Sequence, residues 1–247
     1  MLKFLIALVT VPAVVAAQDQ AVLGPDRGLQ TAFAQLDERL SADLANHIKG
    51  LVNEAVSRGL PGLAIADLVL EGAAKGGSAE QVRAAAQAFA RDLASARDAF
   101  QQAGRVPDAT EIEAGATAMS LGVDGTIISG VANSAPRDHP LSVAVLVIGA
   151  LASQGLPVAD VAAAVLDGLK DNVGDADLAR LSGEAGRMLA EGLRPAEVGR
   201  ALAATITGMT IPAGGPPPNV PRNNGQPGER PVQPPVQPPV QPPVPVP

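Results

Sequence analysis

The amino-acid sequence predicts an all-α protein, a stack of about nine short helices arranged as irregular helical hairpins and followed by a proline-rich tail. From residue 29 to residue 210 the chain is rich in alanine, leucine and valine, and apolar residues recur at the spacing of amphipathic helices. No segment alternates β-branched and polar residues with the period of two that a half-buried strand requires. Glycines recur at comparable points between the apolar segments, which indicates repeated helix ends.

The N-terminus has the features of a secretory signal peptide, predicted over residues 1–17. Lys3 precedes an apolar run, and Val15 and Ala17 fit the −3 and −1 positions of a cleavage site. The run is shorter than the ~20 apolar residues that span a bilayer, so we expect no stable membrane insertion after cleavage. The sequence therefore predicts an exported protein of the periplasm or the extracellular space, with a short mobile lead over residues 18–28.

The first predicted helix covers residues 29–58. Its apolar residues form one stripe that begins at Leu29 and Phe33 and continues to Val56, with polar residues between them. Gly50 lies within this stretch, and a glycine inside a helix weakens it. We therefore expect one long helix with a kink near Gly50.

The later helices follow from a pattern around five glycines, which are Gly59, Gly76, Gly122, Gly155 and Gly192. Each glycine has an apolar residue three places earlier, an apolar β-branched residue six places later and another apolar residue ten places later. A glycine can end a helix in the left-handed conformation, and the apolar residue after it can fold back on that helix. Together with the turn signals between them, these glycines predict helices over residues 62–75, 79–102, 108–121, 125–133, 140–154, 158–170, 176–191 and 196–208.

Several helix starts carry capping signals. Ser78 and Gln81 match a capping box, Asp124 and Asp175 are suited to cap the helices after them, and Pro195 fits a first-turn position. The pattern glycines are 17, 46, 33 and 37 residues apart, and the consensus aromatic and proline positions of tetratricopeptide and HEAT repeats are absent. A compact stack of hairpins and a repeat superhelix both fit this spacing.

The composition excludes several classes of function. The chain has no cysteine, so it has no disulfide, thiolate nucleophile or zinc–thiolate site, and packing alone must hold the fold. Its net charge of −7 is unsuited to nucleic acid or anionic membranes. With four phenylalanines and no tryptophan or tyrosine, it lacks stacking platforms, and we expect Phe33, Phe89 and Phe100 to anchor the N-terminal half of the core.

No catalytic, cofactor-binding or metal-ligating residue is predicted. His47 and His139 are far apart in sequence and have no second histidine at ligand spacing. The segment "DNVGDAD" at residues 171–177 lacks the glycine and glutamate positions of a calcium loop. Ser129 and Ser182 lack the G-x-S-x-G context of a nucleophile.

Two further groups of residues resemble functional motifs, but their place at helix ends explains them as well. Lys75 follows a glycine-containing segment but lacks the order of a phosphate-binding loop, and a helix end is the simpler explanation. The carboxylates of Asp108, Glu111 and Glu113 lie near a helix start, where acidic residues are expected.

Two stretches remain for function. Residues 141–152 are apolar almost throughout, which predicts a central helix or, alternatively, the wall of a groove for an apolar ligand. Residues 211–247 form the tail, in which Val-Gln-Pro-Pro recurs three times and favours an extended polyproline II spacer or docking strand.

The hypothesis from sequence is an exported, non-enzymatic interaction or scaffold module of the bacterial cell envelope, whose partner is another envelope protein. A carrier of a small apolar ligand or lipid is the alternative, and an enzyme with clustered carboxylates is a weaker one. The oligomeric state stays open.

Overall fold

The computed structural model describes residues 25–209, and the chain divides into two units, Met1–Ile211 and Pro212–Pro247. The predicted signal peptide, most of the predicted lead and the proline-rich tail lie outside the described residues. Within them every regular element is an α-helix and no strand is present, which confirms the all-α prediction. The ten helices are α2 (Pro25–Arg39), α3 (Ala42–Ser57), α4 (Gly62–Ala74), α5 (Ala79–Gln102), α6 (Ala109–Ser120), α7 (Gly125–Ser134), α8 (Ser142–Ser153), α9 (Val158–Lys170), α10 (Asp175–Ala190) and α11 (Pro195–Met209).

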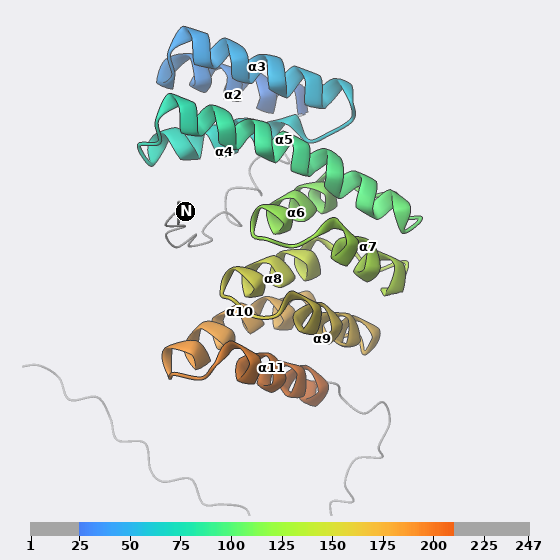
Figure 1. Cartoon of the computed structure of the whole chain (residues 1–247). Helices are drawn as coiled ribbons and strands as arrows, with labels where there is room; N and C mark the ends of the chain where they lie inside the picture. The colour runs from blue at the N-terminus through green and yellow to red at the C-terminus, as the bar shows by residue number, and fades with distance from the viewer. Residues whose placement is uncertain (1–24, 210–247) are drawn as a thin grey trace, which may run out of the picture. The chain divides into compact units, whose positions relative to one another are not determined.

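The helices pack in two layers. Figure 1 shows them stacked in chain order from α2 and α3 to α11. In one layer α2 packs on α4, α6 on α8 and α8 on α10; in the other, α3 packs on α5, α5 on α7, α7 on α9 and α9 on α11. Most helices therefore contact a helix two places away in sequence within their layer, and sequential helices such as α5 and α6 pack on each other across the layers.

The predicted long helix over residues 29–58 is wrong. The chain forms two helices, α2 and α3, and the break lies at Leu40 and Ser41, whereas Gly50 is an interior residue of α3. Ser41 has an extended backbone and occupies the N-cap position of α3, a position that serine favours. Because the apolar stripe continues on both sides of the break, its period did not reveal it. Helix α2 also begins at Pro25, inside the stretch expected to be a mobile lead.

The five pattern glycines all end helices with positive φ, as predicted. At Gly155 (φ +85°) the backbone N–H donates to the Ala152 carbonyl at 2.9 Å, and the Leu156 N–H donates to the Leu151 carbonyl at 3.3 Å. This hydrogen-bond pair satisfies carbonyls at the end of α8. Gly104 and Asn172 adopt the same left-handed conformation, so seven helix ends share one turn geometry within the described residues.

The residues around the pattern glycines form much of the core. The positions six and ten places after each glycine are all buried, namely Ile65, Val82, Ile128, Val161, Val198 and Val69, Ala86, Ala132, Val165, Leu202. The positions three places before them are only half-buried, and Val56 is exposed. The buried apolar residues form an N-terminal core over α2–α6 and a C-terminal core over α5–α11. Phe89 and Phe100 are buried as predicted, whereas Phe33 is half-buried.

The capping predictions hold with one exception. Ser78 with Gln81 forms the expected capping box, the carboxylate of Asp124 accepts from the Thr126 N–H at 2.7 Å, and α11 begins at Pro195. Asp175, by contrast, is the first residue of α10 and not its cap, because Gly174 takes that position. Its side chain is therefore free to contact the loop between α7 and α8, as described below.

Candidate functional site

The start of α6 is built from two acidic side chains. Asp108 and Glu111 form a second capping box, in which the Glu111 N–H donates to Asp108 Oδ1 at 2.8 Å and the Asp108 N–H donates to Glu111 Oε2 at 3.2 Å. The other oxygen of Glu111 accepts from the Leu141 N–H at 3.0 Å. Glu111 is only 9% exposed, so one buried carboxylate joins the start of α6 to the start of α8.

Arg105 is the second buried charged residue. It directly follows Gly104 and is 8% exposed. Its guanidinium donates from Nε to the Ala132 carbonyl at 2.9 Å and from Nη1 to the His139 carbonyl at 3.0 Å. Nη2 donates to the carbonyls of Ala135 and Pro136. One side chain therefore satisfies four carbonyls at the end of α7 and in the α7–α8 loop, where buried polar groups need partners.

The charges around Arg105 support the same arrangement. Burial lowers the pKa of the Arg105 guanidinium, whereas the negative charges of Glu111 and Asp138 act in the opposite direction. Arginine remains protonated in proteins, so the consequence is an attraction between a buried cation and a buried carboxylate. We call Arg105 and Glu111, with the groups they bond, the Arg105–Glu111 node.

A pocket of about 360 Å³ lies at the outer side of this node. It is lined by Gly104, Arg105, Val106, Asp108, Glu111, Arg137, Asp138, His139 and Pro140. Arg137 Nη1 donates to the carbonyls of Ala103 at 3.2 Å and Gly104 at 2.9 Å, and His139 Nε2 lies 3.4 Å from Asp175 Oδ1. Most charged groups of the pocket thus connect the α5–α6 turn, the α7–α8 loop and α10. We therefore assign these groups a structural role.

The residues considered as catalytic candidates from sequence are dispersed. His47 on α3 lies 3.2 Å from Gln87 Nε2 through its own Nε2 and is not near His139. Ser182 Oγ donates to the Ala179 carbonyl of its own helix, and Lys75 Nζ pairs with Glu71 at 2.5 Å. Over residues 25–209, no group of three or more histidine, aspartate or glutamate side chains is arranged to hold a metal ion.

A different set of residues forms an open surface on α4, α6 and α8. Asp67, Glu113 and Leu146 each lie nine positions before the glycine that ends their helix. Each is exposed, although the residue before it in the sequence is buried in every case. The three residues hold equivalent positions relative to these glycines on α4, α6 and α8, of which α6 and α8 pack on each other, and we call this set the Asp67–Glu113–Leu146 face.

The pKa values of the two carboxylates of this face are both raised. Burial raises the pKa of Asp67, and burial together with the negative charge of Asp67 raises the pKa of Glu113. Both carboxylates reach solvent, yet the surrounding protein removes part of their hydration. Neither takes part in a hydrogen bond or an ion pair within the described residues. The fold therefore holds two partly desolvated like charges near each other with no cation between them.

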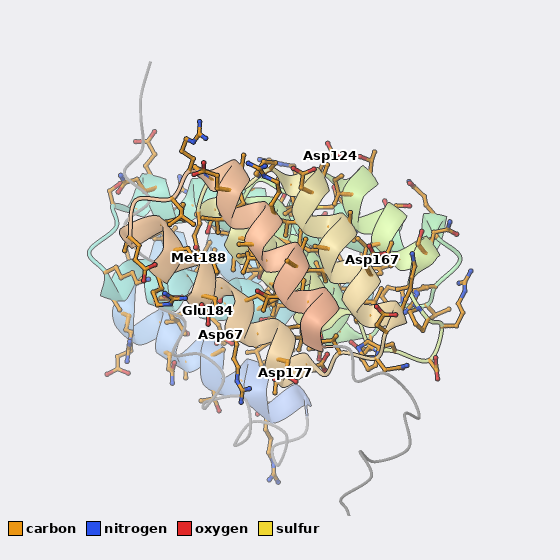
Figure 2. All side chains as sticks on the ribbon, turned by 90° about the horizontal axis from the view of Figure 1, so that it is seen from below. Asp67, Asp124, Asp167, Asp177, Glu184 and Met188 are labelled. Atoms are coloured by element: carbon orange, nitrogen blue, oxygen red, sulfur yellow. The ribbon has the colours of Figure 1, made fainter. Side chains whose placement is uncertain are left out.

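The acidic residue of the next helix in this layer differs. Glu184 of α10 pairs with Arg187 at 2.8 Å, and the same arginine pairs with Glu191 at 2.6 Å. Figure 2 looks along the stack and shows Asp67 on the same side as Glu184 and Met188, opposite Asp124 and Asp167. The side of the stack that carries the unpaired acids thus continues onto α10, where the acids are neutralised.

The apolar stretch over residues 141–152 forms the central part of the C-terminal core. Most of α8 is buried, and Gly149 packs so closely on α6 that an added Cβ would lie 2.9 Å from Ala118 Cα. The neighbouring apolar cavity, which includes Leu151 and Val161, has a volume of about 10 Å³. That volume is close to the space of one water molecule. No helix in the described part of the chain is both long and apolar enough to cross a membrane.

No protein-family model, curated protein or solved structure matches this chain. The site therefore rests on its own geometry. The sequence pattern did not identify Arg105 or the Asp67–Glu113–Leu146 face as features. The residues of the face could have been grouped from the sequence, because all three lie nine positions before a turn glycine.

Proposed function

We propose that the chain is an exported, non-enzymatic interaction module of a bacterial cell envelope, and that its hairpins form a repeat superhelix that presents one layer of helices to a protein partner. Equivalent positions on α4, α6 and α8 support the repeat, as does the shared turn geometry of seven helix ends. Stacked helix pairs create extended surfaces from the same position of successive repeats, and proteins of this architecture bind partners through them.

The Asp67–Glu113–Leu146 face is the observation that carries this proposal. Like charges without a cation, beside an exposed leucine, are unfavourable for the isolated chain and become favourable when a partner covers them. The ionisable groups of the Arg105–Glu111 node, by contrast, are hydrogen-bonded to backbone groups. The proposal assigns binding to the face and structural support to the node.

The proline-rich tail, which lies outside the described residues, is assigned the role of a spacer. A polyproline II segment extends ~3.1 Å per residue, so the 17 residues from Pro231 to Pro247 span about 50 Å. The tail would then extend the reach of the module within the envelope.

Pull-down from an envelope extract tests the proposal. The baits are the full-length mature chain, a chain that ends at Ile211, and a full-length Asp67→Asn/Glu113→Gln variant. We expect the first two baits to recover the same partner and the variant to recover less of it. Failure of every bait to enrich a protein over beads alone would contradict the interaction function. Recovery by the full-length chain alone would assign binding to the tail.

Native mass spectrometry of the freshly purified protein separates this proposal from an apolar carrier. A carrier retains lipid or another small apolar molecule, whereas an interaction module has the mass of the polypeptide alone. Retained lipid that survives exchange into volatile buffer would favour the carrier function.

A further inference from the structure

We propose that the pocket at the Arg105–Glu111 node binds a free amino acid with an apolar side chain, held at its carboxylate by Arg137 and at its ammonium group by Asp138. The pocket shares no residue with the Asp67–Glu113–Leu146 face. The inference therefore goes beyond the proposed interaction function and does not depend on it.

The pocket has the size of a small-molecule site, and its walls are joined by hydrogen bonds. Its volume of about 360 Å³ is at the lower end of the ~300–1,000 Å³ that is typical of ligand pockets, which suits a small ligand. The Arg105 guanidinium donates to the His139 carbonyl at 3.0 Å, and Glu111 accepts from the Leu141 N–H at 3.0 Å. The turn after α5 and the loop between α7 and α8 are therefore held together before a ligand arrives, which lowers the cost of binding.

Arg137 has an oriented guanidinium with donors to spare. Its Nη1 donates to the carbonyls of Ala103 at 3.2 Å and Gly104 at 2.9 Å, which fixes the position of the group. Its Nε and Nη2 make no hydrogen bond with the described residues, and Arg137 takes part in no ion pair among them. These two nitrogens share one edge of the guanidinium, and such an edge can donate two parallel hydrogen bonds to a carboxylate.

Asp138 supplies the unpaired negative group of the same pocket. Its exposed carboxylate makes no hydrogen bond or ion pair within residues 25–209. Glu111, by contrast, accepts from two backbone N–H groups, and Asp108 accepts from a third as the cap of α6. Asp138 is thus the acid of the pocket that the fold does not use, and an ammonium group, with its three donors, is a suitable partner for it.

The balance of charge selects a zwitterion over a simple ion. Two arginines and three carboxylates line the pocket, so with His139 neutral one negative charge is in excess and opposes a simple anion. A simple cation would pair with Asp138 but would leave the free edge of Arg137 without an acceptor. A free amino acid carries an ammonium group and a carboxylate on one carbon atom, and it therefore satisfies both residues.

Val106 and Pro140 give the pocket an apolar part. Val106 is 97% exposed, the highest value among the large apolar residues of the described part of the chain, and Pro140 is exposed as well. An apolar side chain of the ligand that packs on these two residues would remove apolar surface from water. We therefore expect L-valine, L-leucine and L-methionine to bind more tightly than L-serine.

The direct test is isothermal titration calorimetry of the full mature chain with L-leucine and two analogues. L-Leucinamide keeps the ammonium group and lacks the carboxylate, whereas N-acetyl-L-leucine keeps the carboxylate and lacks the ammonium group. We expect each analogue to bind about tenfold more weakly than L-leucine, because one charged contact is lost. The three ligands are compared on the same natural protein, so the result does not depend on the stability of a variant.

Variants assign the two contacts to their residues. Asp138→Asn and Arg137→Gln should each weaken L-leucine binding about tenfold, and Asp138→Asn should leave the fold intact because Asp138 makes no bond within residues 25–209. The matched controls are Asp171→Asn and Arg39→Gln, at exposed residues outside the pocket, which should leave Kd within about twofold. Val106→Ser should weaken binding about threefold, because the ligand covers less apolar surface.

Three results would overturn the inference. The first is the absence of binding by L-valine, L-leucine and L-methionine at concentrations up to about 10 mM. The second is an analogue that binds as tightly as L-leucine, since the pocket would then recognise a simple ion. The third is equal weakening by Asp138→Asn and Asp171→Asn, which would place the ligand outside this pocket. None of these results contradicts the interaction function, which the pull-down tests separately.

Discussion

Glu111 and Glu113 lie two residues apart on α6 and face opposite environments. Glu111 is buried, and its carboxylate accepts two backbone hydrogen bonds, one from the cap of its own helix and one from the start of α8, near the charge of Arg105. Glu113 is exposed, pairs with no side chain of residues 25–209, and has its pKa raised by burial and by the negative charge of Asp67. The first carboxylate completes the fold and the second is unsatisfied within it. Helix α6 therefore carries one carboxylate that stabilises the fold and, two residues later, one that the fold leaves exposed.

The same distinction applies to the turns. In most of the shared glycine turns the residue after the glycine is apolar, as at Leu156, which is 3% exposed. In the Gly104 turn that residue is Arg105, with the same backbone hydrogen bond, from its N–H to the Phe100 carbonyl at 3.0 Å. The backbone geometry is thus independent of the side chain. Arginine is used where the α7–α8 loop presents carbonyls that an apolar residue would leave without donors.

The largest expected effect comes from replacing Arg105 by the leucine that the other turns favour. Arg105→Leu should lower the free energy of unfolding by about 3–5 kcal/mol, because four carbonyls lose their buried donor and the Glu111 carboxylate loses a nearby positive charge. Urea unfolding followed by circular dichroism measures the loss. A variant as stable as the natural protein would show that the two kinds of turn are interchangeable.

The next effect comes from Glu111. Glu111→Gln keeps the shape of the side chain but removes its charge and one acceptor, so a loss of about 1–2 kcal/mol is expected in the same urea experiment. The double variant with Arg105→Leu should lose less than the sum of the two single losses, because both substitutions disrupt one node. Additive losses would mean that the two side chains act independently.

The sequence predicted the turns far better than the charges. The pattern glycines identified their turns because left-handed backbone is a local property that glycine tolerates. Gly104 fell outside the pattern because Val106 and Pro107 lengthen its turn by two residues, so that Ile112 takes the buried position eight places later instead of six. Arg105 could not be predicted, since its carbonyl partners lie 27 to 34 residues further along the chain.

The Asp67–Glu113–Leu146 face was predictable in one respect only. Its members share a position relative to the turn glycines, so alignment of the glycines would have grouped them. Their exposure depends on which layer each helix joins, and the repulsion between Asp67 and Glu113 depends on the proximity of two helices that α5 separates in the chain. Both are tertiary properties that no local signal contains.

A smaller effect of opposite sign is expected on the face. Asp67→Asn/Glu113→Gln should raise the melting temperature at pH 7 by about 1–3 °C, because the substitutions remove a repulsion without removing a partner. Scanning calorimetry measures the change, with Glu38→Gln/Asp171→Asn as the control of equal charge. A gain in stability together with weaker recovery of the partner in the pull-down would show that the face is maintained for function. A lower melting temperature would place Asp67 or Glu113 among the structural charges and would remove the contrast with Glu111.

The smallest expected effect is the pH dependence of the increase in melting temperature caused by Asp67→Asn/Glu113→Gln. Because the pKa values of Asp67 and Glu113 are raised in the folded protein above their ordinary values of 3.8 and 4.5, the folded chain binds protons more tightly than the unfolded chain. Their contribution to stability therefore increases as the pH falls through the raised pKa values, and it is lost as the pH rises through them. Asp124 and Glu197, whose pKa values are lowered by hydrogen bonds, act in the opposite direction in both proteins and cancel from the difference.

The melting-temperature difference between the Asp67→Asn/Glu113→Gln variant and the natural chain should thus be largest at neutral pH and close to zero below pH 3.8, where both carboxylates are protonated. Calorimetry over a series of pH values at constant ionic strength provides the measurement. A difference that stays constant down to acid pH would have to come from packing or hydrogen bonding of the amides, since no charge remains to be removed. Electrostatic repulsion would then no longer distinguish Glu113 from Glu111.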